Sequence, residues 1–370
     1  MTSGERICLG SFIINCSAMP LTPLHDNFAA GSRMGEYRGA ETAAAFGDVA
    51  AEFDALRNGC AIYDLGWRAK LIAAGLDRIR WMNGMVTNNI KDLPLNRGSY
   101  NFLLNAQGRI LGDLYVYNRG DYLLIDTDLS QRGKIREIFE KYIIMDDVEI
   151  SDASEKITAL GLSGTACREL FSKAGIPAGD LQELEVRDVA WNGVGISLTC
   201  GANTTGGGYE LWLAPSNASA AWQRLTQLGA KPAGTDAFEL FRVSRGVPLY
   251  GQDIRERDLP QETAQPQALD FQKGCYIGQE IVERIHSRGN VHRSFTGFEF
   301  GDSRPEVGSK VLAEGKDVGE LTSVAAIPSK NGRPHIIGLG YLRREVAAAG
   351  AELRAGEVRA AAVALPFTNL

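Results

Sequence analysis

The sequence has few residues that could build a metal centre or a disulfide framework. Its 370 residues include six cysteines and four histidines. The cysteines are widely separated and form no CxxC pair: Cys8, Cys16, Cys60, Cys167, Cys200 and Cys275. Zinc sites and small disulfide-rich folds need closely spaced ligands or paired thiols. We therefore expect no resident metal, and free thiols in a reducing, cytoplasmic setting.

Positive charge and long hydrophobic runs are also scarce. Lys and Arg number 39 against 45 Asp and Glu, so a broad electrostatic surface for nucleic acid is not expected. No apolar run approaches the roughly 18 residues of a membrane-spanning helix. The apolar start "ICLGSFIINC" is short and lacks an A-x-A cleavage site. Residues 1–19 have two interpretations. They form a disordered N-terminal extension, or the natural chain starts at Met19.

The rest of the chain alternates between strand and helix patterns. Apolar runs within 99–127 are separated by "NAQG" and "NRGD", which is typical of antiparallel strands. Apolar spacing predicts helices over 76–90 and 131–143. A similar order of elements recurs in 148–230, which indicates a weak internal duplication. After about residue 290, short strands and turn residues predict a small antiparallel barrel or sandwich.

The most specific motif is "KGCYIGQE" at 273–280. Cys275 follows Lys273 and precedes a helical pattern, and both a helix N-terminus and a lysine favour the thiolate. Gly278 would let a backbone or a ligand approach closely. A packed cysteine beside a glycine-dependent turn is the alternative interpretation.

Two histidines, His286 and His292, follow the motif and could supply an imidazole to the thiol. Solvated loop histidines are the more common case. The glycine-rich stretch "TTGGG" at 204–208 lacks the spacing of phosphate-binding loops, so a flexible loop beside a flat ligand is the better interpretation.

The motif resembles the K-G-C-[FY]-x-G-Q-E signature of the YgfZ family of folate-binding proteins. That family belongs to the superfamily of the glycine-cleavage T-protein, or aminomethyltransferase. Further stretches are similar to this superfamily, at 22–39, 100–117, 159–166, 204–213, 241–254 and 318–324. The resemblance implies an α+β, aminomethyltransferase-like folate-binding body over 20–288, with antiparallel sheets and helices. A small C-terminal β-barrel over 289–370 would follow.

The resemblance also implies a cofactor, tetrahydrofolate or a one-carbon-substituted folate, with Glu210 binding the pterin. A buried carboxylate can accept paired hydrogen bonds from a pterin edge, whereas an outward-facing strand glutamate is the alternative. Tyr100 and Tyr250 are candidates to line the pteridine, and Arg242 to meet the carboxylates of the folate tail. Aromatic core packing and a surface ion pair are the competing roles. Gly278 is assigned to the folate site as well.

One departure from the superfamily concerns catalysis. Aminomethyltransferases carry adjacent aspartates in the central hairpin, and the first is associated with catalysis. Here "LGDL" places Gly112 at that first position and Asp113 at the second. Glycine cannot orient an amine, so this departure counts against aminomethyl transfer by the usual route. The catalytic candidates are therefore Cys275, Lys273 and Asp113.

The resemblance to the YgfZ family implies a tetrahydrofolate-binding factor for iron–sulfur cluster assembly or repair in client enzymes, including tRNA-modifying ones. Cys275 would lie at the rim of the folate cavity as a nucleophile, a redox thiol or a transient iron ligand. A lone cysteine cannot hold a stable cluster, because clusters commonly need four thiolates. The expected partners are folate and iron–sulfur client enzymes, without direct contact to nucleic acid or membrane. The alternatives are a folate-dependent aminomethyltransferase or methyltransferase, and a non-catalytic adaptor.

Overall fold

The structure is a computed structural model that describes residues 19–201, 208–289, 291–329, 332–349 and 352–368. Expectations for the N-terminal extension before Met19 and for most of the glycine-rich stretch 204–208 lie outside these residues. Within the described residues, no helix is both long and apolar enough to cross a membrane.

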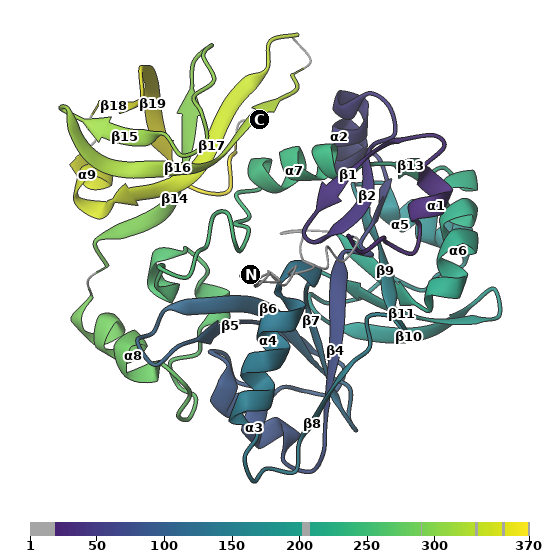
Figure 1. The fold of residues 1–370 in the computed structure, drawn as a ribbon. Coiled ribbons are helices and arrows are strands. Elements are labelled where there is room, and N and C mark those ends of the chain that lie inside the picture. Colours follow the sequence, from purple (N-terminus) through teal and green to yellow (C-terminus); the bar gives the residue numbers. More distant parts are fainter. Residues whose placement is uncertain (1–18, 202–207, 290, 330–331, 350–351, 369–370) are drawn as a thin grey trace, which may run out of the picture.

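A six-stranded sheet forms the first unit of the body, at the right of Figure 1. Its strand order is β10 (Val186–Trp191), β11 (Val194–Cys200), β12 (Tyr209–Leu213), β9 (Thr158–Ser163), β3 (Ala61–Asp64) and β13 (Lys231–Pro232). The helices α5 (Cys167–Ala174) and α6 (Pro215–Gln227) pack on one face. On the other face lie α2 (Val49–Asn58) and α7 (Thr235–Ser244). Both faces of the central strands are apolar, so β12, β9 and β3 are buried throughout, whereas β10, β11 and β13 are partly exposed.

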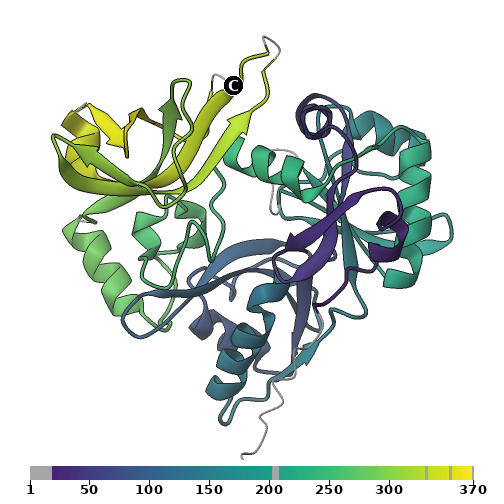
Figure 2. The same cartoon turned by 45° about the horizontal axis from the view of Figure 1, so that its top comes forward.

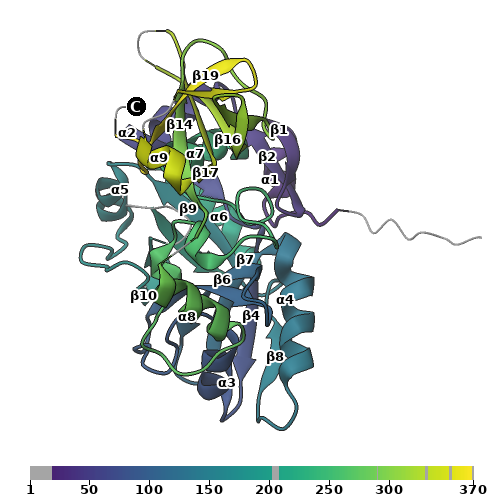
Figure 3. The same cartoon turned by 90° about the vertical axis from the view of Figure 1, so that its left-hand side faces the viewer.

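A five-stranded sheet forms the second unit. Its strand order is β5 (Gly98–Leu104), β6 (Ile110–Asn118), β7 (Leu123–Asp128), β4 (Arg68–Ala74) and β8 (Glu149–Asp152). The helices α3 (Arg78–Met85) and α4 (Leu129–Tyr142) pack on one face, while α8 (Gln279–Arg288) lies on the other (Figure 3). The expected antiparallel meander over 99–127 and the expected helices are present, with α3 shorter than the periodicity predicts.

The sequence did not predict the short elements at the start of the described chain. These are α1 (His25–Phe28) and the hairpin of β1 (Arg33–Tyr37) and β2 (Ala40–Ala45). Alanine favours helix over strand, but the alanine-rich β2 is buried and packs against α7. Tertiary contacts therefore override the local preference.

The third unit is a closed barrel of six strands. Its order is β14 (Arg293–Phe300), β17 (His335–Arg343), β16 (Lys316–Ile327), β15 (Lys310–Ala313), β18 (Leu353–Ala355) and β19 (Val358–Val363), with α9 (Arg344–Ala349) between β17 and β18. This confirms the expected fold class, an α+β aminomethyltransferase-like body followed by a small C-terminal β-barrel.

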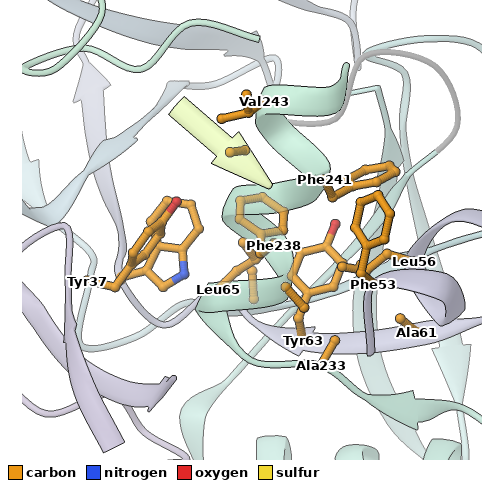
Figure 4. Packing of buried hydrophobic residues seen from close by; sticks show 14 of the residues in the cluster. Tyr37, Phe53, Leu56, Ala61, Tyr63, Leu65, Ala233, Phe238, Phe241 and Val243 are labelled. Atoms are coloured by element: carbon orange, nitrogen blue, oxygen red, sulfur yellow. The ribbon is translucent and has the colours of Figure 1, made fainter. Parts of the chain in front are cut away.

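One apolar cluster joins the barrel to the body. Figure 4 shows Phe238 and Phe241 of α7 facing Tyr63 of β3 and Phe53 of α2. The same cluster continues into barrel residues such as Phe295 and Tyr341. In Figure 2, α7 accordingly lies between the barrel and the six-stranded unit. The three units therefore share one core around α7, and they surround the centre of the molecule.

Candidate functional site

A cavity of about 80 Å³ lies at this centre. Three residues assigned to function from the sequence, Tyr100, Asp113 and Arg242, line it. They come from β5, β6 and α7, which belong to two different units. The sequence could nominate these residues one by one, but only the packing of the units brings them together.

Tyr100 and Asp113 form a partly buried hydrogen-bonded pair in this cavity. The Tyr100 hydroxyl donates to Oδ2 of Asp113 at 2.7 Å, and Gln131 Nε2 donates to Oδ1 at 2.8 Å. Burial and the nearby carboxylate of Asp128 raise the pKa of Asp113, while both hydrogen bonds oppose that rise. Burial thus favours the protonated form of Asp113, whereas its two hydrogen bonds favour the ionised form.

Gly112 occupies the first of the two positions at which aminomethyltransferases carry adjacent aspartates. A Cβ atom on Gly112 would lie 3.1 Å from Gln131 Oε1 and 3.4 Å from Ile135 Cδ1. Both neighbours belong to α4, so a side chain at 112 would point toward that helix. Gly112 thus leaves room for Gln131, whose Oε1 accepts a hydrogen bond from the Asp113 amide at 3.1 Å. This geometry counts against the inference that Gly112 removes a catalytic group, because Asp113 is the residue of the two that lines the cavity.

Sequence reasoning missed a buried charge network beside this pair. The register of β4 and β7 places Arg68 opposite Asp128 and Lys70 opposite Asp126. Lys70 Nζ lies 2.7 Å from Asp126 Oδ1, and Arg68 Nε donates to the same oxygen at 3.0 Å. Arg38 donates to Asp128 at 2.5 Å, and Arg68 donates to it as well. The available signal was the alternating charge in "RAK" and "DTD", within strands that are otherwise apolar.

The network controls the protonation of its carboxylates. Burial alone would raise the pKa of Asp128, but Arg38 and Arg68 bring it below its ordinary value. The same two arginines line the cavity, and each keeps a buried donor, Arg38 Nε and Arg68 Nη2, without a hydrogen-bond partner in the described part of the chain. Buried donors are normally paired, so these two point to a polar ligand or ordered water.

Glu210 lies within the network and not on the described wall of the cavity. Glu210 is 2% exposed, and its Oε2 accepts a hydrogen bond from Trp212 Nε1 at 2.9 Å. Burial and the charge of Asp126 raise the pKa of Glu210, while Lys70 opposes the rise. The alternative of an outward-facing glutamate is therefore wrong. Its role toward a pterin stays a prediction.

All of the N–H donors of the Arg242 guanidinium are paired with acceptors of the protein itself. The side chain donates to Glu239 through Nε and Nη2, to Asp253 and the Val247 carbonyl through Nη1, and to Ser323 through Nη2. A guanidinium has five N–H donors, so none is left for the carboxylates of a folate tail. Ser323 belongs to β16, and Arg242 thus ties α7 to the barrel. Arg242 therefore forms an ion pair, which was the alternative to folate binding, but its pair with Asp253 is buried and not at the surface.

Tyr250 and Gly278 support structure around the central hairpin. The Tyr250 hydroxyl donates to the Leu111 carbonyl at 2.5 Å. Gly278 has φ +86°, and a Cβ there would lie 2.6 Å from the Asn105 carbonyl oxygen, so only glycine lets α8 begin against the β5–β6 turn. Neither is among the described residues that line the central cavity. The geometry therefore favours supporting roles over direct folate contact.

The ammonium of Lys273, which was expected to activate the thiol, pairs instead with backbone carbonyls. Its Nζ donates to the carbonyls of Asn83, Val86 and Asn88 at 2.6, 2.7 and 2.5 Å. Burial lowers the pKa of Lys273 to about 7, although three carbonyl acceptors favour the charged form. The lysine therefore fastens the 270–276 segment to the turn after α3.

Cys275 is exposed and precedes α8, whose N-cap is Gly278. It is not among the described residues that line the central cavity, so the geometry does not support a thiol at the cavity rim. His286 stacks on Phe271 with ring centroids 3.8 Å apart, which gives that imidazole an aromatic partner. Among the described residues, no group of three or more His, Cys, Asp or Glu side chains is arranged to hold a metal ion.

Comparison with known proteins identifies the family. The chain is 29% identical to an aminomethyltransferase of Rubrobacter xylanophilus, covering 94% of this chain and 93% of that protein. It is 26% identical to the putative chloroplastic transferase At1g60990 of Arabidopsis thaliana, covering 82% and 70%. The crystal structure of the glycine cleavage system aminomethyltransferase T from Bartonella henselae has the same fold, with a TM-score of 0.84 at 19% identity, covering 95% and 98%. The GCVT N-terminal domain model matches residues 24–273. Since this match spans more than half of the sequence, the chain belongs to the GCVT N-terminal domain family of the aminomethyltransferase superfamily, a family that implies folate binding in general.

Proposed function

We propose that this chain binds tetrahydrofolate, or a one-carbon-substituted folate, in the central cavity and supports iron–sulfur cluster assembly or repair in client enzymes. The clients include tRNA-modifying enzymes, and the exposed thiol of Cys275 contacts them. The observation that carries the folate part is the cavity itself, where the Tyr100–Asp113 pair lies beside the unpartnered donors of Arg38 and Arg68.

The residues that line the cavity match the chemistry of a folate, but the cavity is smaller than a whole folate. A pterin edge carries hydrogen-bond donors and acceptors, which Asp113 and the two arginines complement. Trp67, Tyr115 and Phe238 supply aromatic surface for a flat ring. The volume of about 80 Å³ is well below the roughly 300–1,000 Å³ of ordinary ligand pockets. The walls must therefore separate when a whole folate binds.

Asp113→Asn is expected to weaken tetrahydrofolate binding by at least about tenfold, because hydrogen bonds to a charged group typically contribute about 1.5–3 kcal/mol. The measurement is anaerobic calorimetric titration. Asp188→Asn is the matched control, since Asp188 is a largely exposed carboxylate on β10. Equal affinity of the two variants, or no saturable binding by the wild type, would contradict a folate site at Asp113.

The cluster-related role depends on the thiol. "KGCYIGQE" resembles the signature of the YgfZ family, and the cysteine in it is exposed. An exposed thiol outside the described cavity wall supports contact with a protein client over direct contact with the folate. Among the described residues, Cys275 is the free cysteine whose side chain is exposed, whereas Cys60, Cys167 and Cys200 are buried or half-buried.

Cys275→Ala is expected to fail in restoring the activity of iron–sulfur enzymes to a deletion strain, while keeping the folate affinity of the wild type. The control is Cys200→Ala, which changes a half-buried thiol on β11. Enzyme activities are measured in lysates of the complemented strains, and folate affinity on the purified variants. Full rescue by Cys275→Ala would remove the thiol from the proposed role.

A second candidate is a folate-dependent aminomethyltransferase. The observation that favours it is the position of Asp113 in the cavity, together with the orientation of residue 112 toward α4. The relatives named above as aminomethyltransferases support it as well. Folate-dependent transfer from a methylamine donor that survives Cys275→Ala and is lost in Asp113→Asn would establish this function in place of the first.

A further inference from the structure

A second cavity, of about 450 Å³, lies where the end of α2, the β9–α5 loop, the end of α7 and the C-terminal tail meet. It shares no described lining residue with the central cavity. The helix α7 separates the two, since Arg242 lines the central cavity and Arg245, one turn further on, lines this one. Its volume falls within the range of ordinary small-molecule pockets, roughly 300–1,000 Å³.

The loop that forms its floor is held firmly against α2. Thr165 Oγ1 donates to the Asn58 carbonyl at 2.7 Å, and Ser163 Oγ donates to the Leu56 carbonyl at 3.1 Å. Gly164 has φ +119°, and a Cβ there would lie 2.2 Å from the Gly59 carbonyl oxygen, so the two backbones touch. These contacts preorganise the pocket, because the segments that carry its charged groups cannot separate easily.

The charge of the pocket is of one sign. Arg57, Arg168 and Arg245 line it, and no aspartate or glutamate does so among the described lining residues. Arg57 is held over the Phe53 ring at 5.6 Å, and interaction with the Tyr209 hydroxyl raises the pKa of Arg168. The chain as a whole has a net charge of −6, so this concentration of guanidinium groups is local. Guanidinium pairs well with carboxylate and phosphate oxygens, which indicates an anionic ligand.

One part of the remaining wall is apolar and largely aromatic, and it is formed by Leu56, Tyr209, Phe241 and Phe367. Figure 4 shows Leu56 and Phe241 on the same side of the core, on α2 and α7. Phe367 arrives from the tail beyond the barrel, so residues from the body and from the C-terminal end build the pocket together. Aromatic walls next to cations suit a ligand with a flat ring and charged groups at one end.

We propose that this cavity binds a small multivalent anion that carries a planar ring. The charged end pairs with the three arginines, and the ring packs between Phe241, Tyr209 and Phe367. The site is separate from the folate cavity and does not depend on the function proposed for it. The anionic groups can be phosphates or carboxylates, since guanidinium binds both.

The test is calorimetric titration of the full chain with ADP as the phosphate probe and benzene-1,3,5-tricarboxylate as the carboxylate probe. At least one probe is expected to bind at one site per chain, and the one that binds identifies the source of the charge. Arg57→Gln and Arg168→Gln should each weaken that binding by about tenfold or more. Pyrophosphate should bind less tightly than ADP, because it lacks the ring.

Arg136→Gln is the matched control, because Arg136 is a half-exposed arginine on α4 in the other unit. It should bind the probe as the wild type does, and so should Asp113→Asn, which alters only the central cavity. Thermal unfolding of every variant checks that the fold is retained. The proposal is overturned if neither probe binds saturably, or if Arg57→Gln and Arg168→Gln bind as tightly as Arg136→Gln.

Discussion

Arg242→Met is expected to destabilise the protein by about 3–5 kcal/mol, the cost of breaking a buried ion pair from one side. The arginine is 3% exposed and donates to Glu239, Asp253 and Ser323. Methionine would fill part of the space but leave the Asp253 carboxylate buried without its cation. The free energy of unfolding, measured by urea denaturation, checks the expectation.

Arg136→Met serves as the control for this prediction. Arg136 forms an i,i+4 pair with Glu140 in which both side chains are about half exposed, so its loss should cost about 0.5 kcal/mol or less. If Arg242→Met leaves stability close to that of the control while tetrahydrofolate affinity falls, the arginine serves the ligand and not the junction with the barrel.

Lys273→Met is expected to cost about 3 kcal/mol or more, because it leaves three carbonyls without their donor at roughly 1–3 kcal/mol for each unsatisfied group. The ammonium now pairs with the carbonyls of Asn83, Val86 and Asn88. The lysine residue is 8% exposed, so water reaches these carbonyls poorly. The measurement is again the free energy of unfolding, taken near neutral pH.

Cys275→Ser provides the contrast two residues further along the same segment. The thiol is exposed, so the substitution should change the free energy of unfolding by no more than about 0.5 kcal/mol. A large loss of unfolding free energy in Cys275→Ser would show that the cysteine contributes to the stability of the segment. A small loss in Lys273→Met would show that the lysine is not needed for stability, which would favour a role in chemistry. The two variants thus separate the structural and the functional halves of the motif.

Local patterns predicted much of the fold. The turns "NAQG" and "NRGD" divide 99–127 into the strands β5, β6 and β7, because those residues favour tight reversals between apolar runs. Apolar spacing predicted α4 to within two residues at its start. The strand β2 escaped prediction, because its alanines carry no strand preference and their burial depends on partners far away in the sequence.

The sequence by itself determined the residue types of the site: Tyr100 and Asp113 in a predicted antiparallel hairpin, Glu210 in an apolar strand, and a cysteine in a specific octapeptide. Only the tertiary structure decided which of them meet. The register of β4 with β7 built the charge network around Arg68, and the closure of three units around α7 turned Arg242 into a structural link. The reason is physical: a side chain's direction follows from its own strand, but its partner follows from packing between segments that no local pattern relates.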